Sequence, residues 1–151
     1  MRGKITGCVA SALFDGDGTE LIDTKVIDGG KVCSYFGSHR FAQYLKKAAT
    51  GALSCIEVDR GTLSDEYLAS APYFECVSMS GLQVDIFNDY IGGEVRLAYY
   101  FDGEKKIPVT GISISGKLSD ALNSVRLSSC SKQTGRYLGP KYALFEGVEI
   151  V

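Results

Sequence analysis

The chain of 151 residues lacks the segments that mark several large classes of protein. No apolar run approaches the roughly 20 residues that a membrane-spanning helix needs. Residues 1–4 lead into a strand-like segment, without the apolar stretch or cleavage site of a signal peptide. Basic and acidic residues number 16 and 18, so the sequence offers no basic face for nucleic acid or for a membrane. We therefore expect no nucleic-acid partner and no membrane contact.

Histidine is nearly absent, which excludes most sites that depend on imidazole. The only histidine is His39. A zinc site built within the chain would need more nitrogen or sulfur donors at close spacing. Any Ser/His/Asp triad would have to use His39, and the G-x-S-x-G sequence of a nucleophile elbow does not occur. A lone histidine beside a helix start is typical of a structural or solvent-facing residue, so we predict no catalytic role for it.

The cysteines occur in an odd number and without C-x-x-C spacing. Four of the five lie among apolar, strand-like residues, and this placement predicts buried free thiols in a reducing compartment. Cys130 differs because its neighbours are small and polar, so it is the one thiol that we consider as a metal ligand. These features favour a cytoplasmic protein. The cysteines are Cys8, Cys33, Cys55, Cys76 and Cys130.

The composition is that of an ordinary globular chain, with 45% hydrophobic and 23% charged residues. Its length fits one domain, so we treat residues 1–151 as a single domain. In the first half, the apolar pattern predicts strands at residues 5–14, 21–27, 31–36 and 53–58. Gly29 and Gly30, which follow Asp28, predict a hairpin turn between the second and third of these strands. Ser38 and Ser64 are predicted N-caps of two short helices. In the first helix, the apolar side chains recur on one face, at Phe41, Tyr44, Leu45 and Ala48.

The second half is predicted to be mostly β. Residues 79–103 have the pattern of two strands joined by a polar, glycine-containing turn, with Leu82, Val84 and Ile86 on a buried face. The change of apolar parity after residue 103 predicts a β-bulge at Gly111. Ser119 is the predicted cap of a third short helix. Residues 128–140 are predicted to form a mobile loop and residues 142–151 a last strand. The expected fold is α+β and predominantly β, with antiparallel or mixed sheets and about three short helices.

One motif resembles an active site. Residues 13–19 contain Asp15 and Asp17 in the pattern D-x-D-G-T, which in haloacid-dehalogenase-type phosphatases supplies a nucleophile and a general acid. Those enzymes need further acids and a lysine delivered by alternating strands and helices, whereas the continuation here is a run of strands. Asp-Gly-Asp-Gly is also the composition that a tight turn favours. We therefore favour a turn and keep the phosphatase as an alternative.

The order of segments along the chain resembles the C-terminal half of the TldD/PmbA family, the peptidases historically called modulators of DNA gyrase. No single segment is specific, but the collinear set covers nearly the whole chain. The segments that carry the resemblance are residues 13–19, 26–32, Ala42, the pair Thr50-Gly51, and residues 81–94, 102–104, 107–109 and 114–116.

The resemblance implies a lineage of zinc peptidases that act on unstructured peptides and assemble as two-subunit particles. In that family, the zinc-binding helix H-E-x-x-x-H precedes the region that this chain resembles, and the chain itself has no such motif. A late cysteine is a third zinc ligand in the catalytic subunits, and Cys130 falls in the comparable part of the chain. Its neighbours lack the glycine-rich setting of that ligand, so we do not assign the role to Cys130.

From these observations we expect a β-rich domain with no catalytic, cofactor-binding or metal-binding residues of its own. One histidine without a paired ligand helix cannot activate water by the zinc route. The domain would serve as scaffold, as dimer surface or as a peptide-binding edge. Its partner would be a family subunit, in a homo- or hetero-oligomer, or an unstructured peptide. A purely structural or interaction module of shared ancestry is the alternative from another class.

Overall fold

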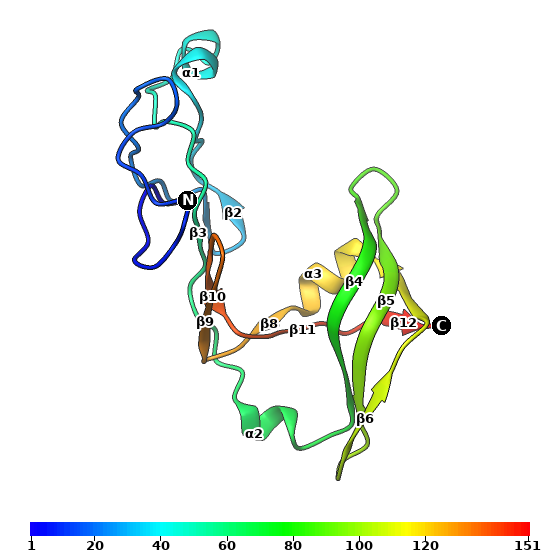
Figure 1. Ribbon diagram of the computed structural model, residues 1–151. Coiled ribbons are helices and arrows are strands. Elements are labelled where there is room, and N and C mark those ends of the chain that lie inside the picture. The colour runs from blue at the N-terminus through cyan, green and yellow to red at the C-terminus, as the bar shows by residue number, and fades with distance from the viewer. The chain divides into compact units, whose positions relative to one another are not determined.

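Two long antiparallel strands, β4 (Tyr73–Asp85) and β5 (Tyr90–Phe101), are the largest elements of the structure, a computed structural model that describes residues 1–151 (Figure 1). The chain divides into two units, which are described separately below. Unit 1 comprises residues 1–59 and 131–140, and unit 2 comprises residues 60–130 and 141–151. None of the helices has the length and apolar character needed to cross a membrane.

Unit 1 contains short strands and one short helix. A two-stranded hairpin pairs β1 with β2, and a three-stranded sheet has the order β3-β10-β9. In this sheet β10 runs parallel to β3 and antiparallel to β9, so the sheet is mixed. The elements are β1 (Ile27–Asp28), β2 (Lys31–Val32), α1 (His39–Leu45), β3 (Ile56–Glu57), β9 (Ser131–Thr134) and β10 (Tyr137–Pro140).

Unit 2 is built around a five-stranded antiparallel sheet. Its order is β12-β7-β5-β4, and β6 also pairs with β5. A small second sheet pairs β11 with β8. With three helices and twelve strands in the chain, the fold is α+β and predominantly β, as the sequence predicts. The remaining elements are α2 (Asp65–Leu68), β6 (Lys106–Val109), β7 (Ile112–Lys117), α3 (Leu118–Ser124), β8 (Arg126–Leu127), β11 (Ala143–Leu144) and β12 (Val148–Ile150).

Several local predictions are confirmed. Ser38 and Ser64 precede α1 and α2, although only the Ser64 side chain accepts a hydrogen bond, from Tyr67 N. The turn at Gly29 and Gly30 joins β1 to β2, and both glycines have positive φ. Such turns need residues that tolerate left-handed backbone, and glycine does so at no steric cost.

The predicted strand at residues 5–14 is wrong, because this segment folds back on itself. The Ser11 hydroxyl accepts from Ile5 N at 2.9 Å and donates to Ile5 O at 2.7 Å, and Cys8 N donates to Ile5 O. These local bonds satisfy the backbone groups that a sheet would otherwise use. The segment nevertheless supplies the core of unit 1, where Ile5 and Cys8 pack with Cys55.

Most of the segment 128–140, predicted as a mobile loop, instead forms the β9–β10 hairpin. The polar residues of β9 face solvent, and β10 pairs on its other edge with β3, about 80 residues earlier in the chain. The strand predicted at residues 21–27 is also reduced, to β1 alone, because Leu21, Ile22 and Thr24 donate to three separate partners. A local sequence pattern holds no information on pairing with distant segments, and this accounts for the wrong prediction at residues 128–140.

In unit 2 the predicted break at Gly111 is present but is not a bulge. Gly111 has a φ of +72° and separates β6 from β7. Both strands pair with β5 in one continuous register, because Ala98 opposes Val109 and Val95 opposes Ile112. The two pairs are three positions apart on β5 and also three positions apart from β6 to β7, so no extra residue is inserted.

Burial differs from the prediction for two thiols and for two apolar faces. Cys33 and Cys76 are exposed, whereas Cys8 and Cys55 are buried. The apolar face predicted on α1 is exposed at Phe41, Tyr44 and Leu45, and Ala42 is the buried residue of that helix. The predicted buried face at Leu82, Val84 and Ile86 is exposed too.

Candidate functional site

The residues that the sequence analysis considered for chemistry do not form a site together. His39 is exposed on α1, and its Nε2 lies 2.9 Å from Gln43 Nε2, one helical turn away. Cys130 is exposed, and its carbonyl accepts hydrogen bonds from Ser128 Oγ and Lys141 N. His39 belongs to unit 1 and Cys130 to unit 2. Neither belongs to a group of three or more histidine, cysteine, aspartate or glutamate side chains that could hold a metal ion.

The carboxylate of Asp15 accepts hydrogen bonds from the turn that it begins and from Ala52. Its Oδ1 accepts from Asp17 N at 3.0 Å and from Thr19 N at 2.9 Å, and its Oδ2 accepts from Ala52 N at 3.0 Å. Donation by Thr19 N and Ala52 N lowers the pKa of Asp15, so the group is held as a structural carboxylate. The strand-to-helix alternation that a phosphatase needs is absent from this part of the chain. The turn interpretation is the one that fits.

A zinc ion does not fit the side chains of this chain. A structural zinc site needs four protein ligands and a catalytic site needs three, at close range. No group of three or more histidine, cysteine, aspartate or glutamate side chains gathers anywhere in the structure. We therefore derive no metal-dependent step from these residues.

The most distinctive surface of the chain is instead the end of the β4–β5 hairpin. Strand β4 pairs with β5 only, so it forms one edge of the five-stranded sheet. Leu82 and Val84 lie near the end of β4, Ile86 begins the turn that follows, and all three side chains are exposed. Phe87 follows in the turn and is 93% exposed. We call Leu82, Val84, Ile86 and Phe87 the hairpin strip.

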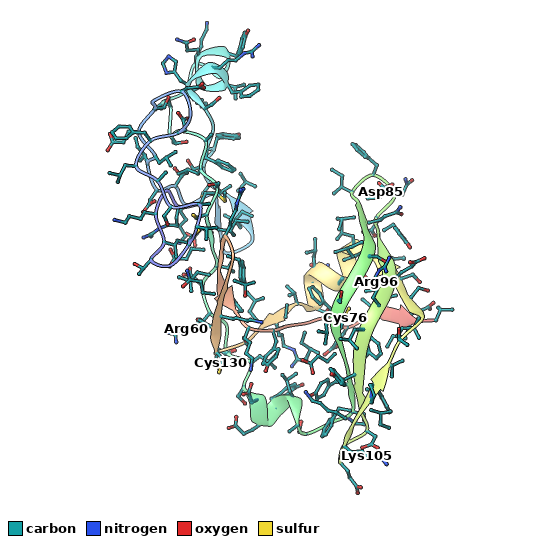
Figure 2. All side chains as sticks on the ribbon, in the orientation of Figure 1. Arg60, Cys76, Asp85, Arg96, Lys105 and Cys130 are labelled. Atoms are coloured by element: carbon teal, nitrogen blue, oxygen red, sulfur yellow. The ribbon has the colours of Figure 1, made fainter.

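The hairpin strip is held on a well-ordered turn. Asp85 closes β4, and its Oδ1 accepts from Phe87 N at 2.9 Å and from Asn88 N at 3.0 Å (Figure 2). Its Oδ2 also accepts from Asn88 Nδ2 at 2.7 Å. These bonds, above all that from the Asn88 side chain, lower the pKa of Asp85. An aspartate that binds the two backbone N–H groups following it is a strong turn former, so the position of Phe87 is fixed locally.

The same turn is joined to helix α3. Asp89 accepts from Ser119 N at 2.7 Å on Oδ1 and from Ser119 Oγ at 2.6 Å on Oδ2, and its carbonyl accepts from Leu118 N. Asp89 therefore satisfies unpaired N–H groups of the first turn of α3, in the manner of an N-cap supplied from another segment. Hydrogen bonds from Ser119 lower the pKa of Asp89. The sequence analysis predicted Ser119 as the capping residue, whereas Ser119 donates the hydrogen bonds and Asp89 accepts them.

Sequence reasoning located the hairpin but missed its surface. It placed glycine in the connecting turn, whereas the turn is at residues 86–89 and Gly92 and Gly93 lie within β5. Gly93 is required there, since a Cβ would lie 2.9 Å from Leu82 Cα in the facing bulge. The run Asp85 to Asp89, rich in Asp and Asn, was the available signal for the true turn.

These features define a β-rich α+β chain with an exposed hairpin surface. Over residues 2–151 the chain matches a family described as the PmbA/TldA metallopeptidase C-terminal domain, and it belongs to that family. The resemblance stated from the sequence is therefore confirmed. No curated protein matches the sequence significantly.

Two solved structures have a similar fold. One is from Thermotoga maritima and is described as a proposed modulator of a DNA gyrase; it has 16% sequence identity and a TM-score of 0.76, and the match covers 99% of this chain and 37% of the other. The second, from Bacteroides thetaiotaomicron and described as a proposed modulator of DNA gyrase, has 17% identity and a TM-score of 0.66, with coverage of 93% and 33%. The chain thus spans about a third of the length of each.

Proposed function

We propose that this chain is the β-rich, non-catalytic part of a PmbA/TldD-type metallopeptidase and that it binds a zinc-bearing family subunit through the hairpin strip. Membership of the family supports the lineage. The side chains offer no grouping suited to zinc, so the metal would be supplied by the partner. In this proposal the chain contributes scaffold and contact surface to an oligomer rather than the hydrolytic step.

The observation that carries the proposal is the exposure of the hairpin strip on a turn that is fixed by hydrogen bonds. Ile86 and Phe87 are 72% and 93% exposed, and Asp85 and Asp89 hold the turn that presents them. A turn whose backbone is already fixed loses little conformational freedom on binding, so the exposed aromatic side chain that it carries can serve as an anchor in a partner's pocket. A large apolar side chain that stays in contact with water does not stabilise the isolated chain, and such exposed groups mark surfaces that a partner covers.

The test is co-expression with a family subunit that carries H-E-x-x-x-H, followed by affinity measurement. We expect a stable complex that Phe87→Ala weakens at least about tenfold, as for a binding hot spot. Phe145→Ala is the matched control, because Phe145 is an exposed phenylalanine of unit 2 outside the hairpin. Equal binding by both variants would contradict the docking role. Stoichiometric zinc and peptide cleavage by the chain alone would contradict its non-catalytic role.

A second candidate function is peptide binding at the edge of β4. Extended peptides are commonly bound by strand addition, which needs an unpaired sheet edge such as β4 offers. Register shifts near Ser78 and between Ser80 and Gln83 interrupt that edge, leaving regular segments at each end. Irregularities of this kind also protect edges from unwanted pairing.

Fluorescence anisotropy with a labelled unstructured peptide distinguishes the candidates. Strand addition predicts binding that is lost when alternate backbone nitrogens of the peptide are methylated, because methylation removes the donors. Equal binding of the methylated peptide would exclude strand addition. A lasting monomer that binds neither peptide nor family subunit would favour the alternative, a structural module of shared ancestry.

A further inference from the structure

Two cysteines of unit 1 lie side by side although 47 residues separate them in the sequence. The Sγ atoms of Cys8 and Cys55 are 2.9 Å apart. Both belong to the buried cluster of unit 1, with residue exposures of 8% and 0%. The other three cysteines are exposed, and none of them is in contact with another thiol. The pair is independent of the hairpin strip and of any docking role.

Backbone hydrogen bonds hold both cysteines in place. Cys55 forms an antiparallel bridge with Arg2, in which Arg2 N donates to Cys55 O at 2.9 Å and Cys55 N donates to Arg2 O at 3.3 Å. On the other side, Cys8 N donates to Ile5 O at 3.0 Å and Ser11 N donates to Cys8 O at 3.1 Å. The two sulfur atoms therefore face each other without any rearrangement of the chain.

The two thiols are not equivalent. A hydrogen bond joins the two thiols, and with Cys55 as its donor it lowers the pKa of Cys8. Burial raises the pKa of Cys55, which has no contact with solvent. A nearby positive side chain, Arg136, lowers the pKa of Cys8 and opposes the rise in the pKa of Cys55, so it does not distinguish the two thiols. The thiolate is the reactive form, and Cys8 keeps 8% exposure whereas Cys55 has none, so we take Cys8 as the thiol that a dissolved oxidant reaches first.

We infer that Cys8 and Cys55 are a reversible intramolecular disulfide site whose oxidant is a small peroxide such as hydrogen peroxide. The Cys8 thiolate attacks one peroxide oxygen and breaks the O–O bond, which yields a sulfenic acid and one water molecule. The Cys55 sulfur then attacks the Cys8 sulfur, forms the S–S bond and expels the hydroxyl group as a second water. In total, two thiols lose two protons and two electrons to the peroxide. A thiol reductant reverses the bond by exchange.

The disulfide would close the part of unit 1 that contains β1, β2 and α1. Cross-linking residues far apart in the sequence restricts the unfolded chain, so oxidation should raise the thermal midpoint of unit 1 by roughly 5–15 °C. Removal of the bond by a reductant should restore the lower midpoint. The consequence is a unit whose stability follows the redox state of its surroundings.

The test uses the full-length variant C33S/C76S/C130S, which retains only Cys8 and Cys55. After exposure to hydrogen peroxide, we expect denatured protein to show no free thiols, a mass lower by two hydrogens and a peptide that links Cys8 to Cys55. Dithiothreitol should restore both thiols. The same variant with Cys8→Ala is the control, and it should keep the Cys55 thiol because burial protects that group from the peroxide.

Three results would overturn the inference: two free thiols after oxidation, cross-linking only between molecules, or a gain of oxygen atoms that dithiothreitol does not remove. The exposed cysteines are replaced in this background, so none of these results can be attributed to them. Should the Cys8→Ala control not fold, peptide mapping of oxidised wild-type protein answers the same question.

Discussion

At the residue scale, four aspartates of this chain serve as hydrogen-bond acceptors at turns and at a helix start. Asp15, Asp85, Asp89 and Asp102 each accept hydrogen bonds from backbone N–H groups of nearby turns or helix starts. In each case these bonds are the main cause of a lowered pKa, or share that role with a side-chain donor. Carboxylates with lowered pKa occur in active sites and in turns alike, and here the geometry assigns them to turns.

Asp89 gives the clearest residue-scale prediction. Asp89→Ala should lower the thermal midpoint of unit 2 by several degrees, since α3 loses its cap and alanine is strained at the φ of +51° found at this position. Asp89→Asn should cost less, because asparagine tolerates that backbone and keeps one acceptor oxygen. Asp120→Ala, which removes an acid from the same first turn of α3, is the control. Thermal denaturation followed by circular dichroism checks the order of the three variants.

The same carboxylates predict how stability depends on pH. The folded-state pKa values of Asp85 and Asp89 lie below the unfolded value, which is about 3.9. Their contribution is therefore fully present above that value and is lost as pH falls through the folded pKa. The difference in thermal midpoint between wild type and D85N/D89N should be constant near neutral pH and should shrink below about pH 4. A difference that grows on acidification would contradict this account.

At the scale of elements, the β4–β5 hairpin combines a buried part with an exposed end. Val95 and Ala98 of β5 are 2% and 0% exposed, since β5 has strands on both of its edges and packs against α3. The residues of the hairpin strip, at the end of β4 and in the turn that follows, contact solvent instead. One hairpin thus supplies both the core of unit 2 and its candidate contact surface.

Matched valine truncations on this hairpin test that division. Val95→Ala should destabilise unit 2 by about 2 kcal/mol, because it removes two buried methyl groups and leaves a cavity. Val84→Ala makes the same chemical change at a residue that is 54% exposed, and it should alter stability by less than about 0.5 kcal/mol. Urea unfolding of the two variants gives the comparison. Equal losses would mean that Val84 is buried in solution, as by self-association.

At the scale of the whole molecule, family membership and local chemistry point to different things. The family is described as a metallopeptidase domain, and the chain spans about a third of the solved structures that it resembles. The candidate ligands His39 and Cys130 lie in different units, and neither belongs to a group of three or more side chains that could hold a metal ion. Family membership therefore establishes the lineage of this chain, and the role of these two residues is a separate question for experiment.

The whole-molecule prediction concerns metal. Dialysis against a chelator under reducing conditions should leave the thermal midpoint unchanged, and one equivalent of zinc should not raise it. The reason is linkage: a metal stabilises the folded state only where that state binds it more tightly than the unfolded chain does. Differential scanning calorimetry with elemental analysis is the measurement. A rise with stoichiometric zinc would reveal a site that the side-chain arrangement does not suggest.

Local chemistry made part of this structure predictable from sequence. The turn at Gly29 and Gly30, the cap at Ser64 and the helix after Ser38 depend on residues a few positions apart. The α+β fold class followed from the same patterns, and the family followed from the order of its segments. Burial was predicted less well, since the alternation of apolar residues such as Val84 predicts a buried face whether or not anything covers it.

By itself the sequence determined the fold class, the short helices, the tight turns and the lineage of this protein, because these depend on local backbone preference and on segment order. Tertiary structure alone decided which thiols meet, which strand completes the sheet of unit 1 and which aspartate caps α3. Those contacts join Cys8 to Cys55, β3 to β10 and Asp89 to Ser119. Each brings together groups at least 30 positions apart, and no local periodicity encodes such a choice.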